Sequence, residues 1–128
     1  MKTDTFSPEY IQNKLFYFQD AAQKFHHDTR SFAEHKALDV LYTSVSEFKD
    51  EILEKIIGYQ GGKRIGKLSI GDIPDYSHAE SLKLADSIKE FAFSLEEWAE
   101  NKKYCDIENI AQGLSGLSAK VLYLLTLT

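Results

Sequence analysis

The stretch SFAEHKALDVLYTSVSEFKDEILEKIIGYQGG, residues 31–62, decides the fold of this 128-residue chain. It opens with the S-x-x-E spacing of a capping box, which satisfies free backbone amides at the start of a helix. Apolar residues then recur every three or four positions, as they do on one face of an α-helix. Gly61 and Gly62 end the stretch, because glycine accepts the left-handed conformation that closes helices. A helix is therefore predicted over residues 32–59. Its core stripe consists of Leu38, Leu41, Val45, Phe48, Ile52, Ile56 and Tyr59.

Three further stretches have the same periodicity and are predicted to be helices: residues 8–27, 79–102 and 107–125. Each follows or begins near a residue that can cap a helix: Ser7, Ser77 and Asp106. Residues 61–78 contain four glycines, one proline and no periodicity, which indicates a long connection. Four amphipathic helices bury their apolar stripes by packing together. We therefore predict a single all-α domain over residues 1–128, a four-helix bundle with a long connection between the second and third helices.

The composition narrows the classes of function. Fifteen Lys and Arg residues against twenty Asp and Glu residues give a net charge of -5. An acidic chain is not drawn to nucleic acid or to anionic membranes, so we expect neither DNA binding nor a membrane partner. The lone Cys105 excludes an internal disulfide framework. The first ten residues have no apolar core like that of a signal peptide, so a cytoplasmic protein is expected.

The predicted helix 32–59 carries four side chains suited to chemistry: His35, Asp39, Asp50 and Glu54. They form two i,i+4 pairs on one stripe, which points about 150° away from the core stripe of the same helix. One interpretation is an ordinary solvated, charged face. Three apolar or aromatic residues in or beside the stripe favour a partner surface instead. They are Tyr42, Leu53 and Ile57.

The positions of the four side chains along the helix suggest that the partner is a second copy of the same helix. The residue numbers of His35 and Glu54 add to 89, and so do those of Asp39 and Asp50. Two copies of the helix that cross antiparallel about a two-fold axis would therefore pair His35 with Glu54 and Asp39 with Asp50, twice over. Each of the two clusters, about 22 Å apart, would hold one imidazole and three carboxylates. Such ligands suit iron or manganese, and the carboxylates would repel one another without a cation.

His26 and His27 lie at the end of the predicted helix 8–27. Either one could add a second nitrogen ligand from the chain that supplies His35. The alternative is a pair of surface histidines at a helix C-terminus, where positive charge is favoured.

The run from His35 to Gly62, H-x3-D-x10-D-x3-E-x6-G-G, resembles the ferroxidase stretch of Dps proteins, the small ferritins of bacteria. The sequence HHDTRSFAEHKALDVLY is similar to the corresponding stretch of short ferritin-like proteins encoded by bacteriophages. The resemblance implies a ferritin-like bundle that oxidises ferrous iron with peroxide or oxygen, for peroxide protection or iron storage. It implies a homodimer and a dodecamer or other higher assembly. It also implies metal ligands from two subunits: His26, His35 and Asp39 from one, and Asp50 and Glu54 from its mate.

A second hypothesis keeps the bundle and its dimer face without catalysis. The chain would then be a structural or interaction protein, associated with a phage or virion. The five candidate ligands would have other partners or none.

Overall fold

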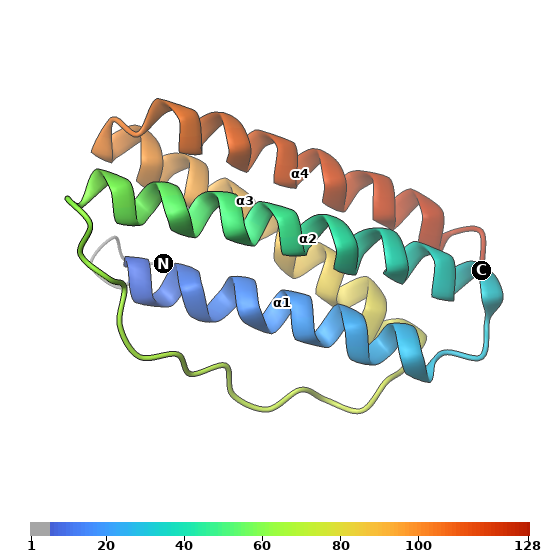
Figure 1. Ribbon diagram of the computed structural model, residues 1–128. Helices are drawn as coiled ribbons and strands as arrows, with labels where there is room; N and C mark the ends of the chain where they lie inside the picture. Colours follow the sequence, from blue (N-terminus) through green and yellow to red (C-terminus); the bar gives the residue numbers. More distant parts are fainter. Residues whose placement is uncertain (1–5) are drawn as a thin grey trace.

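The computed structural model describes residues 6–128 of the chain, and this part contains four α-helices (Figure 1). They are α1 (Pro8–Asp28), α2 (Phe32–Tyr59), α3 (His78–Lys102) and α4 (Cys105–Leu125). The predicted all-α four-helix bundle is confirmed, and each helix begins and ends within two residues of its predicted bounds. None of these helices, within residues 6–128, combines the length and the apolarity needed to cross a membrane.

Serine side chains cap the first three helices, as predicted. The hydroxyl oxygens of Ser7, Ser31 and Ser77 accept hydrogen bonds from backbone amides three residues later, at 3.1–3.2 Å. The predicted cap at Asp106 is wrong, since α4 begins one residue before it and Tyr104 occupies the N-cap position without a side-chain bond. Asp106 instead lies in the first turn and accepts a hydrogen bond from the hydroxyl of Tyr59.

The two glycines after α2 close the helix as expected. Gly61 and Gly62 have φ angles of 70° and 89°, the left-handed region that other residues rarely adopt. The amide of Gly62 donates to the carbonyl of Ile57 at 2.8 Å, the long-range bond of a Schellman motif. The chain then leaves the bundle end in a new direction.

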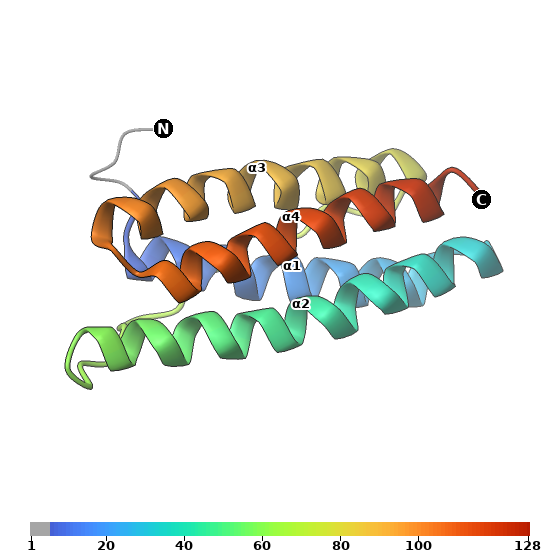
Figure 2. The ribbon, with the colours of Figure 1, turned by 90° about the horizontal axis from the view of Figure 1, so that it is seen from above.

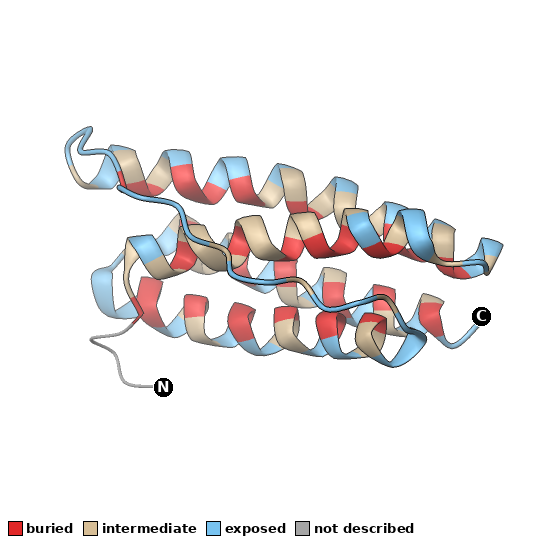
Figure 3. Cartoon of the chain, turned by 90° about the horizontal axis from the view of Figure 1, so that it is seen from below, coloured by how far each residue is buried: buried red, intermediate tan, exposed pale blue. Residues whose placement is uncertain are grey.

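Residues 60–77, which we call the strap, carry the chain back along α1 to the other end of the bundle (Figure 1). As a result α2 and α3 run parallel, while α1 and α4 run antiparallel to them (Figure 2). The strap is largely exposed (Figure 3), with Ile65 as its buried residue. Two hydrogen bonds attach it to α1: the amide of Ser69 donates to Asn13 at 2.9 Å, and Gln12 donates to the carbonyl of Gly66 at 3.2 Å.

The positions that the three-to-four-residue period places on the core side of α1 and α3 are buried throughout: Ile11, Leu15, Phe18, Ala22 and Phe25, and Leu84, Ile88, Phe91, Leu95 and Trp98. Each large aliphatic or aromatic side chain that leaves water contributes about 1.5–3 kcal/mol to folding. On α2 the buried face is wider than one stripe. Leu53 is only 9% exposed, whereas Phe48 is half-buried and Tyr59 is 43% exposed. The reason is that α2 packs against both α1 and α4, so that its covered face includes positions on each side of the predicted line.

Candidate functional site

Two histidines meet where α1 turns into α2. His26 lies in the last turn of α1, and His35 lies in the first turns of α2 after a short connection. Their rings stack with centroids 4.0 Å apart and an interplanar angle of 21°. One turn further along α2, the Oδ1 atom of Asp39 lies 3.7 Å from Nε2 of His26. Three of the five predicted ligands are therefore neighbours within one chain, and we call them the histidine cluster.

The backbone orients one of the two rings. Nδ1 of His35 lies 2.9 Å from the carbonyl oxygen of His26. A carbonyl can only accept, so this nitrogen carries the proton and donates. In the neutral ring the opposite nitrogen of His35, Nε2, is then the one with a free lone pair. Metal-binding histidines have this arrangement, in which a backbone carbonyl fixes the ring and raises its basicity.

The surroundings of His26 lower its pKa and so favour its neutral form. Burial lowers its pKa most strongly, the neighbouring His35 and His27 lower it further, and Asp39 opposes them. Within residues 6–128, Nδ1 of His26 is one of two buried side-chain polar atoms that have no hydrogen-bond partner. A neutral imidazole with a free nitrogen is the form that binds transition metals.

Of the two adjacent histidines, His26 is the one that lies beside the other candidate ligands. The ring of His27 is exposed, and its centroid lies 5.3 Å from that of His26. The carboxylate of Asp39 lies beside His26.

The other two predicted ligands lie elsewhere on the same chain. Asp50 and Glu54 are exposed on the outer face of α2, about 17–29 Å along the helix from Asp39 and His35. Asp50 has one neighbouring cation, since Nζ of Lys49 lies 3.9 Å away. In the part of one chain that the structure describes, no three His, Cys, Asp or Glu side chains are close enough together to hold a metal ion.

The apolar residues beside the stripe differ in how far their own chain covers them. Leu53 is buried in its own chain, and Tyr42 is half-buried, with its hydroxyl accepting a weak hydrogen bond from Gln23 of α1 at 3.4 Å. The packing of α2 against α1 and α4 covers Leu53 and part of Tyr42. Tyr42 and Ile57 are both half-buried and keep some accessible surface, and the partner surface stays a prediction.

Sequence reasoning missed Phe32, which is 73% exposed at the start of α2. Its ring stacks on His35, with centroids 6.4 Å apart, and Nζ of Lys36 lies 5.5 Å from its centroid. A large aromatic residue outside the core stripe was the available signal.

A buried polar cluster joins the first turns of α2 and α3. The carboxylate of Glu34, only 2% exposed, accepts a hydrogen bond from the hydroxyl of Ser81 at 2.7 Å. Nδ1 of His78 lies 3.0 Å from its other oxygen. At the end of the strap, the hydroxyl of Tyr76 bonds to Thr29 at 3.1 Å. These contacts fix the end of the bundle at which the histidine cluster lies.

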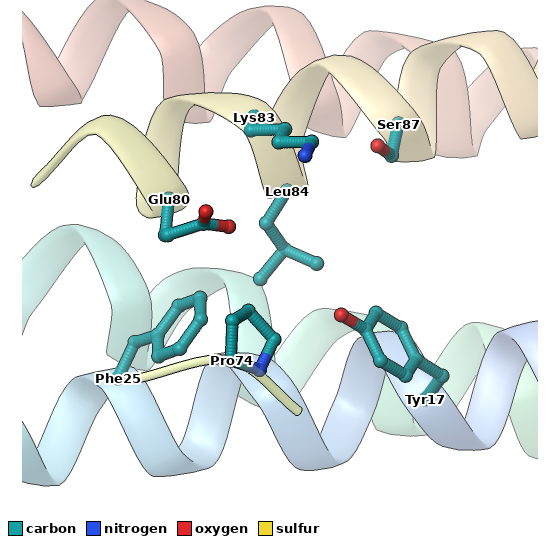
Figure 4. A pocket seen from close by; sticks show the side chains of 7 residues that line it. All are labelled: Tyr17, Phe25, Pro74, Glu80, Lys83, Leu84 and Ser87. Carbon is teal, nitrogen blue, oxygen red and sulfur yellow. The ribbon is translucent and has the colours of Figure 1, made fainter. Parts of the chain in front are cut away.

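Two adjoining pockets lie between α1 and α3 along the strap. The first, of about 240 Å³, has Tyr17 and Phe25 of α1 on one side and four α3 residues on the other, with Pro74 of the strap beside them (Figure 4). The second, of about 390 Å³, shares Tyr17 and Ser87 with the first. None of the five predicted ligands lines either pocket, so these pockets are separate from the histidine cluster.

A family model described as a family of unknown function (DUF5856) matches residues 26–125. No curated protein and no solved structure matches the chain. The expected membership of the Dps branch of the ferritins is wrong, since no ferritin or Dps family model matches. The physical reason is that i,i+4 pairs of charged residues and a closing Gly-Gly belong to any long helix with one solvated face.

Proposed function

We propose that this chain, which belongs to the family of unknown function DUF5856, binds a divalent transition metal between two copies of itself. The observation that carries the proposal is the histidine cluster, in which two stacked imidazoles and a carboxylate meet at the edge of the outer face of α2. The chemistry of these side chains supports it, because neutral imidazole and carboxylate together suit iron and manganese.

One copy would contribute His26, His35 and Asp39. The second copy would contribute Asp50 and Glu54, which share the outer face of α2 with His35 and Asp39 and are exposed for this purpose. The carbonyl contact of His35 supports its role, since it fixes the ring before any metal arrives. The lowered pKa of His26 supports its role, since less free energy is needed to deprotonate it.

The activity that we propose for this site is the oxidation of ferrous iron, with iron as the substrate. Each ferrous ion gives up one electron, so two ions and two protons reduce one peroxide to two waters. The protein's contribution would be to hold the ion among carboxylates, which stabilise the ferric product more than the ferrous substrate.

Complementation between two variants gives a sharp test. His35→Ala and Glu54→Ala would each remove one ligand from every site of a homodimer. In a heterodimer of the two variants, one site keeps all its ligands and the other loses both. An equal mixture, half of it heterodimers, should therefore recover about a quarter of the wild-type capacity.

Anaerobic titration with ferrous iron or manganese measures that capacity. Each variant alone should bind little, and Glu90→Ala, an exposed acid on α3, should bind like the wild type. Oxidation after addition of peroxide should follow the same order. A mixture that recovers no capacity would contradict the two-chain site.

A second candidate is a non-catalytic interaction protein. It is favoured by the lack of a three-ligand cluster in the described part of a single chain. In this case the wild type would bind ferrous iron and manganese no better than the His35→Ala variant does.

A further inference from the structure

We propose that the outer face of α2 is a homodimer interface, in which Phe32 of one copy packs against Ile57 of the other and so sets the register. The proposal rests on the two-copy arrangement of the proposed function, but the contact itself needs no metal. It commits to a second copy of this chain as the occupant of the face.

The first argument is position. At about 100° per residue, Phe32, Asp50 and Ile57 lie within about 20° of one another, along the middle of the outer stripe of α2. Phe32 is 73% exposed and Ile57 is half-buried, so both offer apolar surface there. The antiparallel pairing that brings His35 to Glu54 also brings Phe32 to Ile57. One register thus aligns the apolar pair with the pair of His35 and Glu54.

The second argument is the size of the residues at the crossing point. Thr43 and Ser46 lie on the same stripe and pair with each other in this register. The side chains at a helix contact set the interaxial distance, so small residues allow a close approach there. Phe32 and Ile57 would then cover both ends of the contact.

The third argument is charge. The second half of the outer face carries four exposed acids and no exposed cation of its own: Glu47, Asp50, Glu51 and Glu54. Lys49 is buried, and Nζ of Lys55 points to Asp106 of α4 at 3.5 Å. The first half carries one exposed cation, Lys36, and one exposed acid, Asp39, beside His35. Antiparallel association brings this half, whose exposed charges balance, to the acidic half of the other copy, whereas parallel association would bring the two acidic halves together.

The test uses the full chain with a chelator present, so that no metal contributes. Sedimentation equilibrium should give a concentration-dependent dimer. Phe32→Ala should raise its dissociation constant by about 30-fold, the effect typical of a buried aromatic anchor. The control is Phe93→Ala, which removes a similarly exposed ring from α3 and should change nothing. Circular dichroism confirms that both variants remain folded.

Cross-linking tests the register directly. In a Cys105→Ala background, the double variant Phe32→Cys, Ile57→Cys should form a covalent dimer on mild oxidation. The two cysteines of one chain lie about 37 Å apart along α2, so they cannot pair with each other. Either single variant, Phe32→Cys or Ile57→Cys, should remain largely uncross-linked, because its two copies lie about 37 Å apart along the interface.

The outcomes separate the two proposals. A dimer that depends on Phe32 but binds no metal would contradict the proposed function and support this interface. A dimer that is indifferent to Phe32→Ala, or a monomer at every concentration, would overturn the interface.

Discussion

The buried carboxylate of Glu34 makes the stability of the bundle depend on pH. Burial alone would raise its pKa, but hydrogen bonds from Tyr76, Ser81 and His78 outweigh burial and hold the pKa below its ordinary value. A lowered pKa in the folded state means that the ionised carboxylate stabilises the fold at neutral pH. This contribution is lost as the pH falls below the ordinary range of glutamate, about 4.3, towards the folded-state pKa.

We therefore expect Glu34→Gln to lower the free energy of unfolding at pH 7 by about 1–3 kcal/mol, since a buried polar partner is lost. The difference from the wild type should shrink below about pH 4, where the wild-type carboxylate also takes up a proton. Urea denaturation at several pH values measures both effects. Glu90→Gln, on the exposed face of α3, is the matched control and should be neutral. A Glu34→Gln effect that is the same at all pH values would contradict this linkage.

Helix α4 contains two glycines that differ in one contact. A Cβ atom added at Gly116 would meet nothing within 4 Å, whereas one added at Gly113 would lie 3.3 Å from the ring of Phe48. Alanine stabilises a helix interior by about 1 kcal/mol relative to glycine.

Gly116→Ala should therefore raise the free energy of unfolding by about 0.5–1 kcal/mol. Gly113→Ala should gain less, or lose stability, because the ring of Phe48 must shift by a few tenths of an ångström to make room. Chemical denaturation of the two variants compares them directly. Equal gains would mean that Phe48 moves without cost.

The four helices could be predicted because each feature that defines them is local. The serine caps, the period of the core stripes and the glycines after α2 all act within a few residues of one another. What could not be predicted depends on contacts that are distant in sequence. The sequence predicts that Asp106 caps a helix, but its hydrogen-bond partner is Tyr59, 47 residues away. Glu34 is predicted as part of a capping box, and no neighbouring residue in the sequence indicates that Ser81 donates a hydrogen bond to its carboxylate.

In the candidate site, too, the contacts within one helix could be predicted and those between helices could not. The closeness of His35 and Asp39 follows from helical spacing, whereas the position of His26 and His27 at the end of the first helix left open which of the two would join them. The stacking of His26 on His35 depends on the turn between α1 and α2, which residue spacing alone does not specify.

The strap determines which way the second half of the molecule runs. Its 18 residues, 60–77, can extend over about 60 Å, and the distance that they must span, from the end of α2 back to the level of its start, is about 42 Å. Deleting residues 67–70 leaves enough chain to reach, so we expect the bundle to fold with a modest loss from the Ser69 contact. Deleting residues 63–72 leaves about 26 Å of chain, too little for α3 to lie parallel to α2.

Thermal unfolding followed by circular dichroism should therefore show a cooperative transition for the variant with the shorter deletion. The variant with the longer deletion should lack the cooperative transition of the wild type. Replacing residues 67–70 with Gly and Ser at constant length separates the effect of length from that of lost contacts. A wild-type midpoint for the longer deletion would mean that the strap does not constrain the topology.

The bond between Glu34 and Ser81 also leaves the first hairpin incomplete on its own. A fragment that holds only α1 and α2 lacks the hydroxyl and the imidazole that cover the carboxylate of Glu34 in the whole chain. Such a fragment cannot bury this end of its apolar faces without desolvating an unpaired charge.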